Sequence, residues 1–421
     1  MKKSFVKLFI RGEGLIPESS LREITSGRIF PVLNLRPIPY KNNIPFRAGL
    51  LIIFVLLSVN CVFAGGSSQK TASQSQTQNQ TQTASQTYEL AFITAIGSID
   101  DGSFNQGSWE GLVRYAAERN ITYKHYQPAG QSIGEYLSAI DDAVKSGAKV
   151  IVTPGYLFDV PVFRAQDIYP NVRFIIIDSI PNNGGTSGEK PVYKTGNNTV
   201  GVLYAEDQAG FLAGYAVVKD GYRNLGFLGG AVSSSVIRFG YGFIQGAEYA
   251  AQELGLASGS VTINYHYTGD FIASPAVQAL ALLWYNSGIE VIFACGGAVG
   301  SSVMAAAEQT GRKVVGVDID QSGESQTVIT SAMKMLQISV YDCILSYYTG
   351  TFPGGETLVY HAGNNGIGLP MASSRFRTFS TADYENIMQR LSRGIIPRIE
   401  GISANGSPAG VSVSIVRISE L

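Results

Sequence analysis

The stretch YELAFITAIGSIDDGSFNQGSWEGLVRYAAER, residues 88–119, contains the pattern that recurs along the whole chain. It opens with an apolar run typical of a buried strand (88–96) and continues through a loop of Gly, Ser and Asp residues. An amphipathic segment follows and ends near Arg119. Asp101 or Ser103 is suited to cap that helix. The stretch therefore reads as one strand–loop–helix unit.

Further units of this kind follow up to the last third of the chain. Short apolar runs alternate with helix-length segments such as 134–147, and the runs rich in Val and Ile predict a parallel sheet covered on both faces. The eight predicted strands are 88–96, 121–127, 148–155, 173–179, 224–230, 261–269, 291–297 and 313–319. Four of them precede residue 200 and four follow it. The sequence therefore predicts an α/β protein with two similar lobes.

The amino-acid composition limits the size of the folded part and the kinds of partner that it is expected to bind. The chain has 421 residues, of which 45% are hydrophobic, and a formal net charge of −1. That is enough apolar material for one large or two medium cores. Because the charge is balanced and no long basic run occurs, neither nucleic acid nor an anionic lipid surface is an expected partner.

The N-terminus has the features of an export signal. Residues 48–59, AGLLIIFVLLSV, have the length of a signal-peptide apolar region and are shorter than the roughly 20 residues that span a bilayer. The pentapeptide LSVNC resembles a bacterial lipobox, which would make Cys61 the lipidated residue. Cleavage by ordinary signal peptidase after Ala64 and a transmembrane anchor are the alternatives. We expect a leader over 1–64, with residues 1–40 explained by a start codon assigned too far upstream.

A tract of Ser, Thr and Gln follows the leader at residues 65–87. It has almost no apolar side chains and cannot offset its ordering entropy, so we expect a flexible tether. A tether behind a lipid anchor predicts a protein held at the cell membrane and facing the periplasm or the cell exterior.

Catalytic and metal-binding motifs are missing from the sequence. There is no G-x-S-x-G elbow and no phosphate-binding P-loop, and the nearest approach to G-x-G-x-x-G, at 240–246, is one residue too long. The three histidines, His125, His266 and His361, lack metal-ligand spacing. We therefore expect neither an enzyme nor a metal or cofactor site.

Two cysteines lie in the part expected to fold, Cys295 and Cys343. Both occur in apolar runs, so we expect buried free thiols, with a single disulfide as the alternative.

Polar, glycine-rich and aromatic residues gather where predicted strands end. In parallel sheets these ends form one edge, where ligands bind. The segments in question are IGSIDDGSFN, TPGYLFD, IDSIPNN, GGAVSSSVIRFG, YTGDFIASP, CGGAVG and VDIDQSG. Because both halves carry such segments, we expect two edges that face one cleft.

The loop of the opening stretch has two interpretations. Phe104 or Trp109 could present a ring face to a planar ligand, while Asn105 and an Asp supply directional hydrogen bonds. Alternatively, the acids cap the helix and Phe104 packs inward.

The segment DDGSFNQGSWEG (100–111) resembles the signature of the basic-membrane-protein (BMP/PnrA-like) family of lipoproteins, the nucleoside-binding components of ABC importers. The resemblance extends over roughly 88–380, and the order of DDGSFN before GVDIDQ is specific to it. The other matching segments are EDQAGFLAGY, GFLGGAVSSSVIRFGYGFIQGAEYA, YTGDF, VIFACGGAVGSSVMAAAE, VITSAMKM and HAGNNGIGL.

The resemblance implies the type I periplasmic-binding-protein fold, with two Rossmann-like lobes of parallel sheets joined by a hinge of three crossovers. On this sequence we expect lobe 1 to span 88–203 plus about 325–355, and lobe 2 to span 204–324 plus about 356–421.

The resemblance also implies a set of ligand contacts. Asp101 and Asn105, with Phe104 or Trp109, would come from the first signature, and Asp178 from the position of a base-binding acid. Phe239 or Phe271 would be the second aromatic wall. The residues expected around the ribose are Gly297, Asp318 and Lys334. Three of these have other interpretations, since Asp318 could be a turn acid, Lys334 a rim ion pair and Phe239 a core residue.

By the same resemblance we expect a monomeric lipoprotein that captures a purine nucleoside and delivers it to an ABC permease. Two alternatives stay open. One is a binding protein of the same fold for riboflavin, a sugar or an autoinducer, and the other is a surface adhesin or antigen.

Overall fold

The computed structural model describes residues 87–421 except 186–188, 397 and 399–400. The expected leader, Cys61 and the tether up to residue 86 lie outside the described residues. Among the helices of the described part, none is both long and apolar enough to cross a membrane.

The first lobe is built on a six-stranded sheet in which every pair of neighbours is parallel. In spatial order its strands are β11 (Thr357–Tyr360), β5 (Thr199–Tyr204), β4 (Arg173–Ile177), β3 (Val150–Pro154), β1 (Leu90–Ile93) and β2 (Tyr123–Tyr126). Its helices are α1 (Phe104–Arg119), α2 (Ile133–Lys145), α3 (Asp159–Ile168) and α8 (Leu336–Tyr348). Alternate residues of β1 enter different cores: Leu90 and Phe92 pack on the side of α1, Ala91 and Ile93 on the side of α2. The sheet is therefore buried on both faces, as the apolar runs predict.

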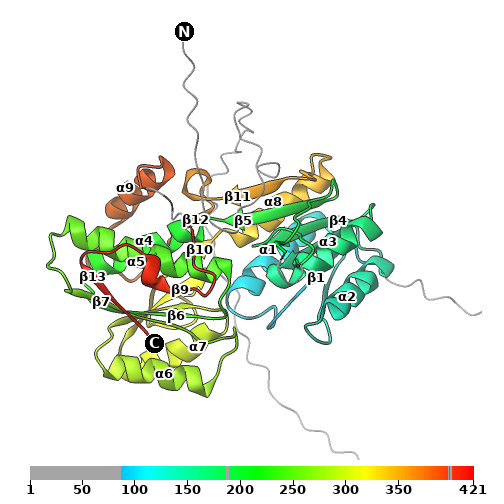
Figure 1. Cartoon of the computed structure of the whole chain (residues 1–421). Coiled ribbons are helices and arrows are strands. Elements are labelled where there is room, and N and C mark those ends of the chain that lie inside the picture. The colour runs from blue at the N-terminus through cyan, green and yellow to red at the C-terminus, as the bar shows by residue number, and fades with distance from the viewer. Residues whose placement is uncertain (1–86, 186–188, 397, 399–400) are drawn as a thin grey trace, which may run out of the picture. The chain divides into compact units, whose positions relative to one another are not determined.

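The second lobe is built on a seven-stranded sheet (Figure 1). In spatial order its strands are β12 (Ile367–Gly368), β10 (Val328–Lys334), β9 (Lys313–Asp318), β8 (Val291–Cys295), β6 (Asn224–Gly229), β7 (Val261–Tyr267) and β13 (Val416–Glu420). Only β12 is antiparallel to its neighbour. Its helices are α4 (Glu206–Lys219), α5 (Ser234–Glu253), α6 (Pro275–Asn286), α7 (Val299–Thr310) and α9 (Thr381–Ser392).

The chain crosses between the sheets three times: from β5 into α4, from β10 into α8, and from β11 towards β12. Sheet membership places two segments differently from the expected boundaries. Residues 328–334 form β10 and pair with β9 of the second sheet. Residues 357–360 form β11 and pair with β5 of the first sheet. The second crossing thus follows β10, whereas we expected it near residue 325.

Helices α4 and α5 pack closely through glycines. A Cβ atom on Gly214 would lie 2.0 Å from the carbonyl oxygen of Phe243, and one on Gly246 would lie 2.0 Å from that of Phe211. The EDQAGFLAGY segment is therefore a packing element. Gly242 and Gly246 of the near-miss glycine motif belong to the same interface, whereas Gly240 faces Tyr265 and Phe227.

Cys295 and Cys343 are buried and free, which confirms that expectation.

Candidate functional site

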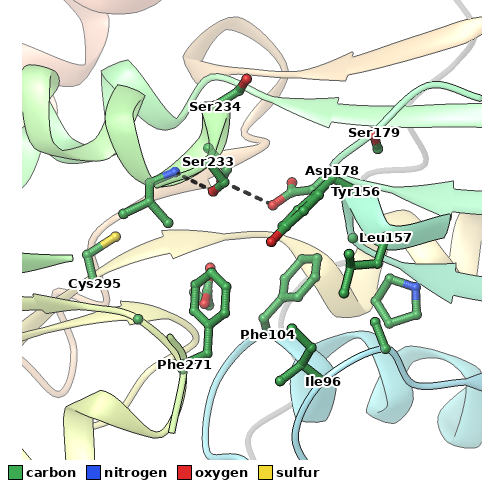
Figure 2. Close-up of a pocket in the computed structure, with 18 of the residues that line it drawn as sticks. Ile96, Phe104, Tyr156, Leu157, Asp178, Ser179, Ser233, Ser234, Phe271 and Cys295 are labelled. Atoms are coloured by element: carbon green, nitrogen blue, oxygen red, sulfur yellow. Dashed lines mark hydrogen bonds between the residues drawn. The ribbon is translucent and has the colours of Figure 1, made fainter. Parts of the chain in front are cut away.

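A cavity of about 750 Å³ lies between the two lobes at the carboxyl ends of the strands. Figure 2 shows side chains of both lobes pointing into it. Nine of the ten predicted ligand-binding residues line it: Asp101, Phe104, Asn105, Asp178, Phe239, Phe271, Gly297, Asp318 and Lys334. The volume falls within the range of small-molecule sites.

Trp109 is the tenth predicted residue, and it does not line the cavity. Its ring makes edge contacts with Phe92, Tyr123 and His125, at centroid distances of 5.6, 5.5 and 6.0 Å. Of the two aromatic residues that the sequence left open in the first signature, the structure brings Phe104 to the cavity.

A buried ion cluster joins the lobes at the cavity wall. Lys334 Nζ lies 2.5 Å from Asp178 Oδ2 of the first lobe and 3.0 Å from Asp318 Oδ1 of the second. Ser103 donates a hydrogen bond to Asp318 Oδ2 (2.6 Å), and Ser235 donates one to Asp178 Oδ2 (3.1 Å). The other oxygen of Asp178, Oδ1, is buried and has no hydrogen-bond partner among the described residues. It is thus available to a hydroxyl or N–H group of a ligand.

The two aspartates occupy equivalent positions in the two sheets. Asp178 directly follows β4 and Asp318 ends β9, and each of these strands is the neighbour of the strand before a crossover. Both residues have left-handed backbone conformations, with φ values of 60° and 68°. Such conformations are uncommon for residues other than glycine and tend to persist at functional sites.

The charge of Lys334 is retained in spite of its burial. Burial lowers its pKa, but the carboxylates of Asp178, Asp318 and Glu206 outweigh that effect, so the pKa is raised overall. Glu206 is buried beside this cluster, and burial raises its pKa to about 7, although the positive charge of Arg238 opposes the shift. A carboxyl group with a pKa near neutral therefore lies next to the cluster.

Aromatic rings from both lobes face the cavity (Figure 2): Phe104 and Tyr156 from the first lobe and Phe271 from the second. The ring of Phe271 lies against the backbone of Gly230, where a Cβ atom would be 2.5 Å from Phe271 Cδ1. Phe239 is only 1% exposed and packs edge-on against Phe293. Phe271 is therefore the better placed of the two candidates for the second wall, and Phe239 is mainly a core residue.

Tyr156 was not among the predicted residues, although it lies in the strand-end segment TPGYLFD, which the sequence marks as part of the cleft. It is 43% exposed and lines the cavity. Ser103 and Ser235 were also missed. In the sequence, a serine in a glycine-rich loop that donates a hydrogen bond to a buried aspartate looks the same as a serine in an ordinary turn.

Asp101 both lines the cavity and caps α1. Its carboxylate accepts hydrogen bonds from the backbone N–H groups of Ser103 (2.9 Å), Asn105 (3.1 Å) and Gln106 (3.0 Å). Burial raises the pKa of Asp101, and these three hydrogen bonds oppose the rise. Asn105 uses its amide group to hold the preceding loop, donating to the carbonyl of Ile96 at 2.8 Å. The capping and binding interpretations of this loop are thus compatible.

Acidic side chains outnumber basic ones around the cavity. The acidic residues that line it are Asp100, Asp101, Asp159, Asp178 and Asp318, and the basic ones are Arg238 and Lys334. Both basic groups have acidic neighbours, since Lys334 contacts two aspartates and Arg238 lies 3.7 Å from Glu206. Burial raises the pKa of Asp159 to about 6, against hydrogen bonds from Ser179 and Asn182. The described residues contain no cluster of His, Cys, Asp and Glu that could hold a metal ion.

The sequence and its fold were compared with known proteins. The model of the family described as "ABC transporter substrate-binding protein PnrA-like" (Bmp) matches residues 89–403. A nucleoside-binding protein of an ABC transporter, BmpA of Lactococcus lactis, is 27% identical over 314 residues, which cover 69% of this chain and 84% of the relative. Basic membrane protein A2 of Borrelia garinii is 30% identical over 63% of this chain and 74% of the relative. A protein of Listeria monocytogenes described as a CD4+ T-cell-stimulating antigen is 26% identical over 73% of this chain and 87% of the relative.

Solved structures of ABC-transporter solute-binding proteins share the fold. The one from Aeropyrum pernix K1 superposes with a TM-score of 0.64 at 19% identity and covers 76% of this chain and 99% of the other. The one from Conexibacter woesei gives a TM-score of 0.58 at 21% identity, over 74% and 99% of the two chains. Together with the two sheets and three crossovers, these likenesses confirm the predicted type I periplasmic-binding-protein fold.

Proposed function

Because the chain belongs to the Bmp family of PnrA-like ABC-transporter substrate-binding proteins, we propose that it captures an uncharged nucleoside, preferably a purine nucleoside, and delivers it to an ABC permease. The observation that carries the proposal is the pairing of rings and acids across one cleft. Phe104 and Phe271 come from opposite lobes, and the unpartnered oxygen of Asp178 is buried in the same cavity wall. Rings suit the faces of a nucleobase, and carboxylates suit ribose hydroxyls or base N–H groups.

The charge of the cavity favours nucleosides over nucleotides. A phosphate group would enter a cavity lined by five aspartates, in which the two basic side chains are already close to acidic groups. Like charges in a partly desolvated site repel, and no helix or loop with unpaired cations compensates for them among the cavity-lining residues. Nucleoside 5′-monophosphates should therefore bind much more weakly than the corresponding nucleosides.

The proposed mechanism is closure of the lobes on the ligand. A nucleoside that touches Phe104 and Asp178 on the first lobe and Phe271 and Asp318 on the second favours the closed conformation by its contacts to both. A permease that recognises the closed form would then receive loaded protein. We further propose that the protein acts as a monomer, anchored through lipidated Cys61 to the cell membrane and facing the periplasm or the cell exterior.

The test is a binding panel on the purified folded part. Adenosine, guanosine and inosine should raise the melting temperature, since a ligand of the folded state stabilises it by mass action. Their 5′-monophosphates should not. Phe104→Ala and Phe271→Ala should each weaken nucleoside binding by about 1–3 kcal/mol, the value of one base–aromatic stack, measured by titration calorimetry. Trp109→Phe is the matched control and should bind like the wild type.

Two results would contradict the proposal. Stabilisation by riboflavin or a sugar with none by nucleosides would assign another ligand to the same fold. No stabilisation by any compound of the panel would favour the role of a surface adhesin or antigen.

A further inference from the structure

The C-terminal segment, residues 401–420, borders the cleft at the point where the family match ends, residue 403. Ile402 and Ala404 line the cavity, together with the residues described above. In Figure 1 the red end of the chain runs beside α5 before it forms β13. Part of the cavity lining thus comes from a segment most of whose anchoring residues, from Gly406 to Val416, lie beyond the family's matched region.

The start of this segment is tied to two tyrosines of the second lobe. Tyr241 Oη donates a hydrogen bond to the carbonyl of Ser407 (2.5 Å) and accepts one from the backbone N–H of Ser403 (3.3 Å). Tyr267 Oη donates to the carbonyl of Gly406 (3.1 Å). A Cβ atom at Gly406 would be 2.8 Å from Tyr267 Oη, so the backbone rests directly on that ring.

The end of the segment is tied to α5 and β7. Strand β13 pairs with β7 in parallel, from Val416 opposite Val261 to Glu420 opposite Tyr265. Glu248 of α5 accepts hydrogen bonds from the backbone N–H groups of Ser414 (2.9 Å) and Val416 (2.8 Å). Helix α5 contains Ser235 of the cavity, and Phe271 of the cavity follows β7. The C-terminal segment is therefore fixed to the two elements of the second lobe that position these residues.

We propose that Ile402 and Ala404 form an apolar wall that contacts the bound nucleoside and limits the size and polarity of its substituents on that side. This inference rests on the proposed function. Residues 401–408 carry no charged side chain, so this wall offers no ion-pair partner to a ligand. The segment is hydrogen-bonded to the second lobe both before and after Ser407. A larger side chain at Ile402 or Ala404 therefore cannot be accommodated by moving the segment away unless these hydrogen bonds break.

The test compares two bulky variants with one matched control. Ile402→Trp and Ala404→Leu fill the proposed wall, and Ile415→Trp adds the same bulk to a partly buried residue of the same segment that does not line the cavity. Affinities for adenosine, guanosine and inosine are measured by calorimetry, and folding is checked by melting of the ligand-free proteins. We expect Ile402→Trp or Ala404→Leu to weaken binding at least about tenfold, with Ile415→Trp within about twofold of the wild type.

Ala404→Leu keeps the test decisive if the larger substitution impairs folding, because Ala404 is exposed in the ligand-free protein. Wild-type affinity in both folded wall variants would overturn the inference and leave the proposed function standing. An equal loss in Ile415→Trp would also overturn it, because the effect would then come from the segment's fold. If the wild type itself binds none of the three nucleosides, the proposed function is wrong, and the inference about Ile402 and Ala404 is wrong as well.

Discussion

Asp101 carries out a structural task with the same carboxyl group that lines the cleft. It accepts three backbone N–H groups at the start of α1 and so satisfies donors that the helix leaves free. Its contribution to binding can therefore be measured only after its contribution to folding is known.

Replacement of Asp101 by Ala should lower the free energy of unfolding of the ligand-free protein by about 1 kcal/mol, the usual cost of a lost N-terminal cap. Asp101→Asn is the graded comparison and should lose less, because its one amide oxygen can still accept the hydrogen bonds of Ser103 and Gln106, whereas its NH2 group would face the N–H of Asn105. Urea unfolding followed by circular dichroism provides the measurement. Equal stability of Asp101→Ala and the wild type would mean that the cap does not matter here.

Single residues of the site were predictable where a motif fixed them and ambiguous where two candidates shared it. Phe104 and Trp109 are five positions apart on one helix, so they point about 140° apart at 100° per residue. Both cannot face the same cavity, yet the sequence alone does not say which one does. Phe239 and Phe271 presented the same choice, and only packing against Phe293 identifies Phe239 as a core residue.

At the scale of elements, the α4–α5 pair depends on glycines that admit the backbone of the opposite helix. Gly210 and Gly214 of α4 face carbonyl oxygens of α5, and Gly242 and Gly246 of α5 face carbonyl oxygens of α4. A methyl group at any of these positions would clash with backbone atoms, which cannot rotate away as a flexible side chain could. The clash can be removed only if the two helices move apart.

Gly214→Ala should therefore destabilise the protein by about 1–3 kcal/mol, the range for overpacking a close contact. Gly134→Ala is the matched control: Gly134 also lies in a helix, but its Cβ atom would meet only Ser132 Oγ at 3.9 Å. That control should be neutral or slightly stabilising, since Ala favours helix. Thermal unfolding of the three proteins distinguishes them, and an undiminished melting temperature in Gly214→Ala would contradict the packing argument.

All eight strands predicted from apolar runs are present, whereas no apolar run predicted β5, β10, β11, β12 or β13. The reason differs among them. β10 is buried but contains Thr330 and Ser331, whose hydroxyl groups are hydrogen-bonded within the lobe, so its sequence lacks a continuous apolar run. β12 has only two residues, which is too short for a recognisable apolar run, and most of β13 is exposed, so its sequence is not predominantly apolar.

At the scale of the whole molecule, Glu206, which is buried beside the ion cluster that joins the lobes, makes stability depend on pH. The pKa of Glu206 is about 7 in the folded protein, against an ordinary value of 4.5. Between these two values the folded chain holds a proton that the unfolded chain has lost. The contribution of this group to the free energy of unfolding therefore falls as the pH rises from about 4.5 to about 7.

Glu206→Gln removes this titration, so the melting temperature of the variant should change less between pH 5 and pH 7 than that of the wild type. Some slope should persist below pH 6 in both proteins, because the raised pKa of Asp159, about 6, acts in the same direction. Differential scanning calorimetry across this range gives the comparison. Identical pH profiles would show that Glu206 is not the group responsible.

The two-lobed architecture was predictable because alternation and strand count are local properties of the sequence. The expected lobe boundaries misplaced β10 and β11, since the point at which a chain leaves one sheet for the other is decided by pairing between distant strands. β11 pairs with β5 across more than a hundred residues, from Thr357 opposite Gly201 to Tyr360 opposite Tyr204. No local signal marks such a partner.

The three crossovers also constrain the order in which the molecule can be completed. The first sheet lacks its edge strand β11 until residue 360 has been made, and the second lacks β13 until residue 420. A chain shortened before residue 357 would lack the edge strand of the first sheet, and one shortened before residue 416 would lack an edge strand of the second. Each sheet would then expose the unpaired edge of the strand that the missing one covers, β5 in the first sheet and β7 in the second.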